Sequence, residues 1–424
     1  MQEAHDPYGA LRQRDYRRLL TGSMLFTLGS EMQAVAVGWE LLQRTDSALA
    51  LGFAGLTQFL PVLLLALPAG HAADRFDCKK LLMASQGLVF FTSLGLAALS
   101  FWEGPVFLVY LCLLMVGVAR AFNVPARWAL LPRVIAPEML PNAVTWNSSG
   151  FFIARASGPP LGGVILALTM PATSYLLTAG CVLCCVSLMA TLRPRPVARS
   201  TEAPSLRTLL AGMHFVWQSR PILATISLDL FAVLLGGATA LLPIFAEKIL
   251  DVGPTGLGLL RAAPAFGALV IAFIMAHHPP LQHAGKTLLV AVAGFGLATI
   301  VFGLSKNFPL SFAMLVLAGA FDNISVVVRG TLVQMLTPEA MRGRVGAVHF
   351  VFVSSSNELG DFESGVTAFY FGAVASVVMG GIGTLLVVLA VMALWPPILR
   401  LSLKRPTPDA TDPSSLETAT VPPA

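Results

Sequence analysis

The chain has 424 residues, of which 56% are hydrophobic and 12% are charged, and its formal net charge is +5. A soluble globular protein carries about 25% charged residues, so this composition excludes an ordinary water-soluble fold. The Lys and Arg residues gather at alternate ends of the hydrophobic runs, so the positive charge records membrane topology and implies no nucleic-acid partner.

Long hydrophobic runs follow one another along almost the whole chain. A bilayer core of about 30 Å needs roughly 20 apolar residues for each spanning helix. The pattern predicts an all-α polytopic membrane protein with twelve transmembrane helices in two pseudo-symmetric six-helix bundles. The twelve runs are 19–42, 48–69, 81–101, 105–131, 141–169, 172–192, 221–246, 255–277, 287–304, 308–335, 345–370 and 372–395.

The polar segments divide the chain into five parts. Residues 1–18 end in a basic cluster, do not resemble a secretory signal and are expected to be cytoplasmic. The first bundle, 19–192, is followed by a cytoplasmic linker with an interfacial helix, 193–220. The second bundle, 221–395, precedes a disordered cytoplasmic tail, 396–424. The basic residues therefore predict that both termini are cytoplasmic.

The connection between the second and third runs, "GHAADRFDCKKLL", is unusually rich in charge. Gly70 is expected to allow a tight turn there. Asp74 can accept hydrogen bonds and can lie near the N-terminus of a helix in the other bundle. Arg75, Lys79 and Lys80 would keep the loop in the cytoplasm. The alternative is a solvated basic turn with no further role.

The two halves of the sequence resemble each other. Segment 120–138 matches segment 322–339, and in this register Arg127 corresponds to Arg329. Parallel six-helix repeats are one recognised transporter architecture. The repeat therefore supports two related bundles in one chain.

Charged residues inside the runs follow the same division. Such residues are costly in lipid, so they face the bundle interior or a wet cavity. The third, sixth, ninth and twelfth runs contain none, which predicts that these helices shield a polar central path from lipid. Charged residues within the other runs include Glu31, Arg120, Arg127, Arg155, Asp229, Arg261, Asp322, Arg329, Glu358, Asp361 and Glu363.

Five of the acids are candidates for proton coupling. Glu358 and Asp361 share one helix face, and Glu363 lies close by, so the three cannot all ionise at low cost. Such a group suits a proton carrier, although a structural network with Arg155 and Arg261 would explain it equally well. The candidates are Glu31, Asp229, Asp322, Glu358 and Asp361.

A second set of residues is expected to line a substrate cavity suited to aromatic or amphipathic solutes. Its members are Gln33, Trp39, Gln58, Arg120, Asn123, Arg329 and Asn357. Arg120 and Asp322 occupy equivalent positions in the repeat and are hypothesised to attract each other across the path. Alternatively, each pairs with acids or bases of the fifth and eleventh runs.

Three motifs resemble those of a known family. Gly70-x-x-x-Asp74-Arg75-x-x-x-Lys79-Lys80 resembles the signature between helices 2 and 3 of the major facilitator superfamily, apart from Asp77 and Cys78. In that family the loop joins the two bundles on the cytoplasmic side, and the resemblance implies this role here.

The fifth run contains Gly158-Pro159-x-x-Gly162-Gly163, which resembles a helix 5 motif of proton-coupled antiporters in this superfamily. Ordinary glycine-mediated helix packing is the alternative. "LLPRVIAPEMLPNAV" and "SSSNELGDFESG" resemble the enterobactin-exporter-like branch of bacterial efflux permeases.

These features together predict a secondary active transporter of the bacterial inner membrane. The resemblance implies proton-coupled antiport that exports a small amphipathic molecule, siderophore-like or drug-like, by alternating access. An importer or facilitator of the same fold is the alternative, and a membrane sensor is a more distant one. No catalytic or phosphate-binding motif is evident, so neither an enzyme activity nor a cofactor or metal is expected. The expected partners are the substrate, protons and lipid, and the chain is expected to act as a monomer.

Overall fold

The computed structural model describes residues 6, 8–195, 213–277 and 283–401, and no strand occurs within them. In chain order the helices are α1 (Gly9–Arg12), α2 (Arg14–Thr45), α3 (Ala48–Arg75), α4 (Cys78–Phe101), α5 (Val106–Val134), α6 (Leu140–Leu168), α7 (Pro171–Ala190), α9 (Arg220–Gly236), α10 (Leu242–Ile244), α11 (Gly253–His277), α12 (Ala284–Leu304), α13 (Phe308–Leu336), α14 (Arg342–Phe371) and α15 (Ala373–Leu394). The shorter helical segments are η1 (Pro137–Met139), η2 (Thr239–Leu241), the π-helix η3 (Phe245–Ile249), η4 (Glu339–Met341) and η5 (Pro396–Arg400).

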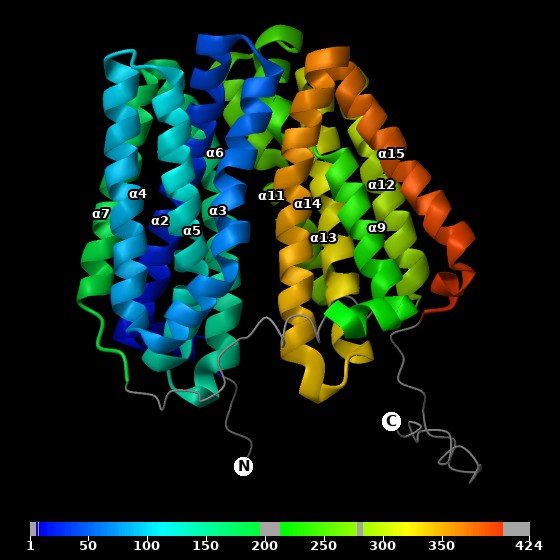
Figure 1. Cartoon of the computed structure of the whole chain (residues 1–424), viewed down its shortest axis with the longest axis horizontal. Helices are drawn as coiled ribbons and strands as arrows, with labels where there is room; N and C mark the ends of the chain where they lie inside the picture. Colours follow the sequence, from blue (N-terminus) through cyan, green and yellow to red (C-terminus); the bar gives the residue numbers. More distant parts are fainter. Residues whose placement is uncertain (1–5, 7, 196–212, 278–282, 402–424) are drawn as a thin grey trace.

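All twelve predicted runs fall on helical segments (Figure 1). Within the described residues, 10 helical segments are long and apolar enough to cross a membrane. Helices α2 and α14 are not among these, although they have 32 and 30 residues, because acidic and amide side chains interrupt their apolar surface. The structure therefore supports a polytopic helical protein in which α2 and α14 are the most polar of the long helices.

Each bundle repeats one packing pattern. In the first, α2 packs on α6 and α7, α5 packs on α3 and α4, and α4 packs on α7. In the second, α9 packs on α14 and α15, α13 packs on α11 and α12, and α12 packs on α15. The pairings correspond one to one, so the repeat in the sequence is a repeat in space.

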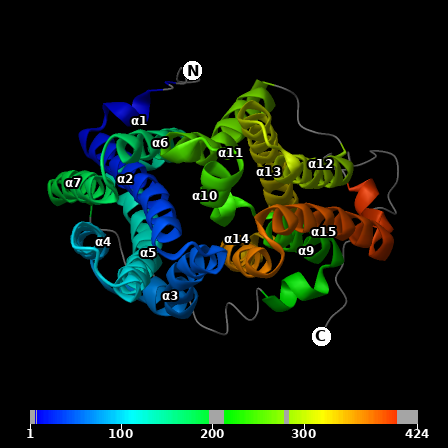
Figure 2. The same ribbon diagram turned by 90° about the horizontal axis from the view of Figure 1, so that it is seen from above.

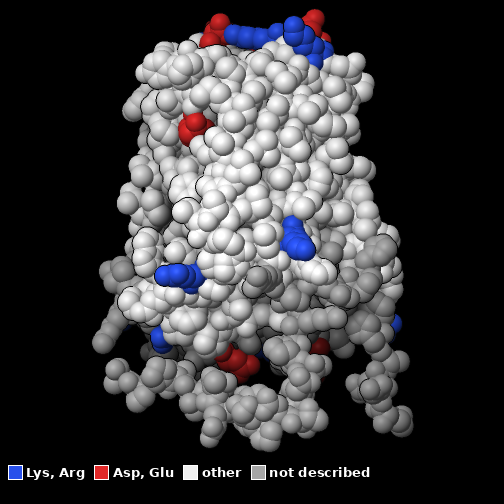
Figure 3. Space-filling view, turned by 90° about the vertical axis from the view of Figure 1, so that its right-hand side faces the viewer, with Lys and Arg blue, Asp and Glu red and all other residues white. Residues whose placement is uncertain are grey.

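The charge-free helices lie at the periphery. Helices α4, α7, α12 and α15 occupy the outer positions when the protein is seen from above (Figure 2). They expose apolar side chains such as Phe91, Leu183, Val290 and Leu386. Over α12 and α15 the surface forms a wide band with few charged side chains (Figure 3). This apolar band is the surface that a lipid bilayer would cover.

The two bundles meet along two helix pairs, α6 with α11 and α3 with α14, on opposite sides of the centre (Figure 2). Glycine permits both contacts. A Cβ atom on Gly163 of α6 would lie 2.6 Å from the carbonyl oxygen of Pro254, and one on Gly365 of α14 would lie 2.7 Å from the Cα of Gly52. Small residues allow helix backbones to approach this closely.

These contacts lie towards one end of the molecule, called here the far end, where α2 and α6 finish. The opposite end, called the linker end, is where α7 finishes and α9 begins. One apolar cluster at the far end contains residues of both bundles, including Leu41, Leu241, Phe245 and Phe302. At the linker end the first bundle has one cluster of its own and the second bundle has two. The bundles are therefore joined at the far end and separate at the linker end, as Figure 1 shows.

The seventh run differs from its prediction as one continuous helix. Helix α9 ends at Gly236, Gly237 is extended, and the chain resumes through η2, α10 and η3. The Gly-Gly pair weakens the helix at this point, and Pro243 starts the next helical turn without needing an amide donor. After the interruption the run contacts α3 and α2 of the first bundle as well as helices of its own bundle.

The Gly163 contact can be tested by adding one methyl group. Gly163→Ala should lower the free energy of unfolding by about 1–3 kcal/mol, because the new methyl group overlaps the backbone of α11. Gly180→Ala on α7 is the matched control, since its Cβ would meet no atom within 4 Å. The control should be neutral or stabilising by up to about 1 kcal/mol. Thermal unfolding in detergent measures both variants, and equal effects would contradict the close contact.

Candidate functional site

An ion pair connects the two bundles near the middle of their helices. The guanidinium of Arg120 on α5 lies 3.2 Å from the carboxylate of Glu358 on α14. The side chains are 47% and 19% exposed, although both stand far from the ends of their helices. Because they come from different bundles, the accessible space around them lies between the bundles. In this conformation Arg120 pairs with the eleventh span rather than with Asp322, which was the alternative that the sequence left open.

A second ion pair lies on the wall formed by the first bundle. Arg155 of α6 approaches Glu31 of α2 at 3.6 Å, and its guanidinium carbon lies 5.9 Å from the ring centre of Phe151. The Arg155 side chain is 55% exposed. Its charge also acts on Asp322 of α13 in the other bundle, and Asp322 forms no ion pair with any described residue. Arg155 therefore connects acids of both bundles electrostatically.

The acids of α14 separate into two groups. The Asp361 carboxylate accepts a hydrogen bond from the backbone N–H of Ala240 at 3.2 Å and lies in the fields of Glu358 and Arg261. Glu363 instead accepts a hydrogen bond from Thr367 within its own helix. Glu358 and Asp361 thus belong to the space between the bundles, together with Arg261 of α11.

Asp229 and Arg329 form a buried ion pair inside the second bundle. Their side chains are 5% and 1% exposed, and the hydroxyl of Ser325 also lies 3.5 Å from the Asp229 carboxylate. The pair joins α9 to α13. This placement differs from the expectation that Arg329 lines a substrate cavity and makes Asp229 a structural counter-ion, because Arg329 alone would be a buried uncompensated charge.

Two further cavity candidates also lie in helix packing. Gln33 of α2 accepts a hydrogen bond from Ser93 of α4 at 2.7 Å, and Asn123 of α5 donates one to Ser85 of α4 at 3.3 Å. Both side chains are buried. In this conformation they join helices of the first bundle rather than line the space between bundles. Polar residues serve such interhelical bonds in apolar surroundings.

The remaining cavity candidates are Trp39, Gln58 and Asn357, which form no hydrogen bond between described helices. Trp39 packs against the shared apolar cluster at the far end. The amide of Gln58 donates to Ala54 in its own helix, and the amide of the exposed Asn357 donates to Val353. Among the described residues, neither amide forms a hydrogen bond to another helix.

The glycine motif of α6 serves close packing on two sides. A Cβ on Gly158 would lie 2.7 Å from the Glu31 side chain, and one on Gly162 would lie 2.9 Å from the backbone of Met32, so both face α2. Gly163 faces Gly258 of α11. Helix α6 continues through Pro159. The motif therefore lets α6 contact both bundles at once, which is the helix-packing role given above as the alternative.

The charged connection between α3 and α4 is shorter than expected. Gly70 lies within α3, which continues to Arg75, and the turn occurs at Phe76 and Asp77. The prediction of a turn at Gly70 was therefore wrong, since the helix tolerates this glycine. The Asp77 side chain caps α4 by accepting the N–H of Lys79 at 2.9 Å. The Asp74 side chain lies outside the described part of the structure, and Lys80 is exposed.

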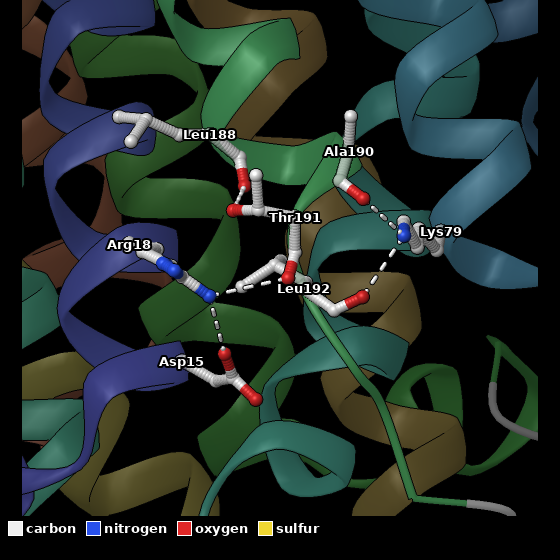
Figure 4. A network of polar contacts seen from close by, with 7 residues as sticks. All are labelled: Asp15, Arg18, Lys79, Leu188, Ala190, Thr191 and Leu192. Carbon is white, nitrogen blue, oxygen red and sulfur yellow. Dashed lines mark hydrogen bonds and ion pairs between the residues drawn. The ribbon is translucent and has the colours of Figure 1, made fainter.

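Lys79 contacts its own bundle (Figure 4). Its ammonium donates to the carbonyl oxygens of Ala190 and Leu192 at 2.7 and 2.9 Å, and Arg18 donates to that of Thr191 at 3.2 Å. Cations at a helix C-terminus complete its free carbonyls and oppose its dipole. Lys79 therefore fixes the end of α7, where the linker to the second bundle starts, and its hydrogen bonds to described residues stay within the first bundle.

Two polar contacts at the far end were missed by the sequence analysis. Gln43 donates to Glu247 of η3 at 2.5 Å, and Lys248 pairs with Asp46. Both connect the end of α2 to the end of the interrupted seventh span. Exposed pairs of this kind contribute about 1 kcal/mol or less. The shared apolar cluster beneath them therefore supplies most of the stability of this contact.

A buried acid of α2 was also missed. The hydroxyl of Tyr175 donates to Glu40 at 2.6 Å, and Glu40 pairs with Arg44. Arg44 in turn donates to the carbonyl oxygens of Leu99 and Gly104 at the end of α4. The i, i+4 spacing of Glu40 and Arg44 was the available signal. This network lies within the first bundle and is not part of the space between the bundles.

Comparison with known proteins agrees with this arrangement. The family model described as "Transmembrane secretion effector" (MFS_3) matches residues 5–411. The chain is 27% identical over 402 residues to the enterobactin exporter EntS of Citrobacter koseri, covering 93% of this chain and 95% of that protein. It is 25% identical over 373 residues to the staphyloferrin A transporter of Staphylococcus aureus, covering 86% and 92%.

Solved structures share the fold at low sequence identity. A bacterial homologue of the human lysosomal transporter Spinster, in an inward-facing and unoccupied conformation, has a TM-score of 0.70 at 15% identity and covers 91% of this chain and 97% of its own. The nucleoside transporter NupG has a TM-score of 0.70 at 14% identity, with 90% and 98% covered.

Two repeated helical bundles around a charged, accessible centre define a membrane transporter of the major facilitator superfamily, and not an enzyme. Within that superfamily the chain belongs to the transmembrane secretion effector family.

The buried pair inside the second bundle should behave as a structural element. Asp229→Asn should lower the free energy of unfolding by about 3–5 kcal/mol, because Arg329 loses its counter-ion. The double variant Asp229→Leu, Arg329→Met should recover much of this loss. Glu31→Gln, at the more exposed pair with Arg155, should cost about 1 kcal/mol or less. Denaturation in detergent compares the variants, and a double variant no more stable than Asp229→Asn would argue against direct pairing.

Proposed function

We propose that this protein is a proton-coupled exporter that moves a small amphipathic molecule of the siderophore class by alternating access. The observation that carries the proposal is the pair of separately packed bundles that share a core only at the far end and enclose accessible charges. Substrate class and outward direction are supported by the named activities of relatives that align over nearly the whole chain.

The direction of opening follows from the proposed topology. In this proposal both termini and the linker lie in the cytoplasm of a bacterium, as the basic residues predict. The far end is then the outer side, which is closed, and the central charges are reached from the cytoplasm. Helices α2 and α14 complete twelve spans in this proposal, with their polar faces turned to the path. Residues 9–192 and 220–394 would be the two units that move relative to each other.

The paired charges suit exchange between a proton and a substrate. Arg120–Glu358 and Arg155–Glu31 are each accessible from the space between the bundles. In its charged form either acid can accept a hydrogen bond from a hydroxyl group of the substrate while its arginine donates to a substrate oxygen, and protonation of the acid removes this acceptor, so that proton and substrate exclude each other. When the proton leaves, the acid can take the next substrate. Asp322 and Asp361 are the other acids that face this space, whereas buried Asp229 has no part in the proposed exchange.

The experiment that tests the proposal is transport in sealed vesicles. Purified protein in proteoliposomes should move enterobactin or staphyloferrin A, used as probes, when a proton gradient is applied. Collapse of the gradient should abolish accumulation. Movement down the probe's own gradient alone would indicate a facilitator. Accumulation coupled to proton entry in the same direction would indicate an importer, and no flux of either probe would contradict the substrate class.

Removal of the coupling acids provides a sharper test. Glu31→Gln, Asp322→Asn and Glu358→Gln each remove an acid that faces the central space, and at least one should lower gradient-driven export by about tenfold or more. Downhill exchange of the probe should change less in that variant, because substrate binding is retained. Glu363→Gln is the control, since Glu363 bonds within its own helix. Full gradient coupling in all three variants and in Asp361→Asn would eliminate the antiport mechanism.

Closure at the far end must alternate if the protein transports. Cysteines placed at Asp46 and Lys248, in a variant without the five native cysteines, can be joined by a short cleavable cross-linker. The cross-linked protein should lose transport and recover it when the linker is cleaved. The two single-cysteine variants, treated identically, serve as controls. Unchanged transport by the cross-linked protein would show that this end does not open.

A further inference from the structure

The interruption of the seventh span coincides with a set of contacts from α14. Asp361 accepts the N–H of Ala240 at 3.2 Å, immediately after the break. The hydroxyl of Ser364 donates to the carbonyl oxygen of Gly237 at 2.5 Å, within the break itself. A Cβ on Gly360 would lie 2.9 Å from the carbonyl oxygens of Val233 and Leu234, just before it. One face of α14 thus contacts the break on both sides.

The Asp361 contact depends on charge. The run from Thr239 to Ile249 is helical throughout, and Ala240 lies in its first turn. Free N–H groups and a partial positive charge occur at such an N-terminus, so a carboxylate binds there more strongly than a neutral acid. Ser364 holds the same break through a neutral hydrogen bond. The two contacts therefore differ in whether a proton can weaken them.

The other end of this helical run makes the polar contacts between the bundles. Glu247 and Lys248 contact Gln43 and Asp46 of α2. Phe245, between the two ends, stacks on Phe302 with ring centres 4.6 Å apart and belongs to the shared apolar cluster. A helical run of this length spans about 15 Å. If segment 239–249 moves as a rigid unit, a displacement at Ala240 also displaces Glu247 and Lys248 at the far end.

We propose that Asp361 is a positioning residue which, in its charged form, holds the segment 239–249 in the closed arrangement and releases it when a proton binds. The inference deepens the proposed proton-coupled transport and rests on it. It assigns to Asp361 control of the outer closure, whereas the pairs of Arg120 and Arg155 serve the substrate. No contact of Asp361 with substrate is required.

The groups around Asp361 are consistent with a proton-sensitive contact. Glu358, one turn earlier on α14, opposes its negative charge, and Arg261 of α11 favours it. The Nε atom of Arg261 is buried and has no hydrogen-bond partner among the described residues. On α3 the facing residue is Gly55, which brings no charge. Arg120 of α5 reaches this group through Glu358. The charge of Asp361 is thus balanced by neighbours from both bundles.

The test measures closure without substrate. Spin labels on cysteines at Gln43 and Glu247, in a variant without the native cysteines, report the distance between α2 and η3. Between about pH 8 and about pH 5, the ratio of separated to closed molecules should rise about tenfold, since a hydrogen bond to a charged group contributes that order of equilibrium change. Asp361→Asn should show a raised ratio at both pH values and no further response to pH.

Two variants separate positioning from general destabilisation. Ser364→Ala removes the neutral contact at the same break, so it should raise the separated fraction at every pH and keep the pH response. Glu363→Gln removes a nearby carboxylate of α14 that does not contact the break, so it should behave as the parent protein. The inference is overturned if Asp361→Asn keeps the parent pH response, or if the parent protein shows none.

The outcomes for the inference and for the proposed function differ. If proton-driven flux is measured but Asp361→Asn retains pH-dependent closure, another acid transmits the proton and the inference fails alone. If the distance responds to pH through Asp361 but no probe is transported, the proposed substrate class fails and the inference stands.

Discussion

Close contact between glycine backbones is the constraint on which the arrangement of the two bundles depends. Gly163 meets Gly258 on one side of the central axis, and Gly52 meets Gly365 on the other. At these points the helices approach within the distance that a methyl group would occupy, which allows the apolar side chains nearby to form one core across both bundles. Larger residues would separate the helix pairs and expose that core.

The charges follow from this geometry. Because the two bundles share an apolar core only near the far end, the middle of the path remains accessible, and the arginines there can be charged without full loss of solvent. Where solvent is absent, as at Arg329, the acid is fixed beside it. The same two residue types therefore serve stability inside a bundle and are available for chemistry between bundles. Burial, rather than sequence position, separates the roles.

Much of the fold could be predicted because its causes are local. Run length and the absence of charge identify outer helices such as α12 and α15, whatever their neighbours are. The break at Gly236 was hidden because the whole segment is apolar, so periodicity gave no boundary. Gly365 was overlooked although it occupies in the second bundle the place that Gly163 has in the first, and a comparison of the two fifth helices would have shown it.

The site was less predictable because its pairings are not local. The spacing of Arg120 and Asp322 in the repeat indicated similar depth but could not show that Glu358 is nearer. Gln33 and Asn123 look like cavity residues when each apolar run is considered alone. In the structure, each forms a hydrogen bond with a serine hydroxyl of α4. Whether such a polar group faces a substrate or bonds to a neighbouring side chain depends on where the adjacent helix, here α4, lies.

The shared apolar cluster at the far end has a thermal consequence. Separation of the bundles there would bring the surfaces around Leu241, Phe245 and Phe302 into contact with water. Exposure of apolar surface increases the heat capacity, and the cost of that exposure falls as the temperature falls. In the proposed transport cycle the balance between the closed and separated forms would therefore follow a curved dependence on temperature, and cooling would shift it towards the form that is open at the far end.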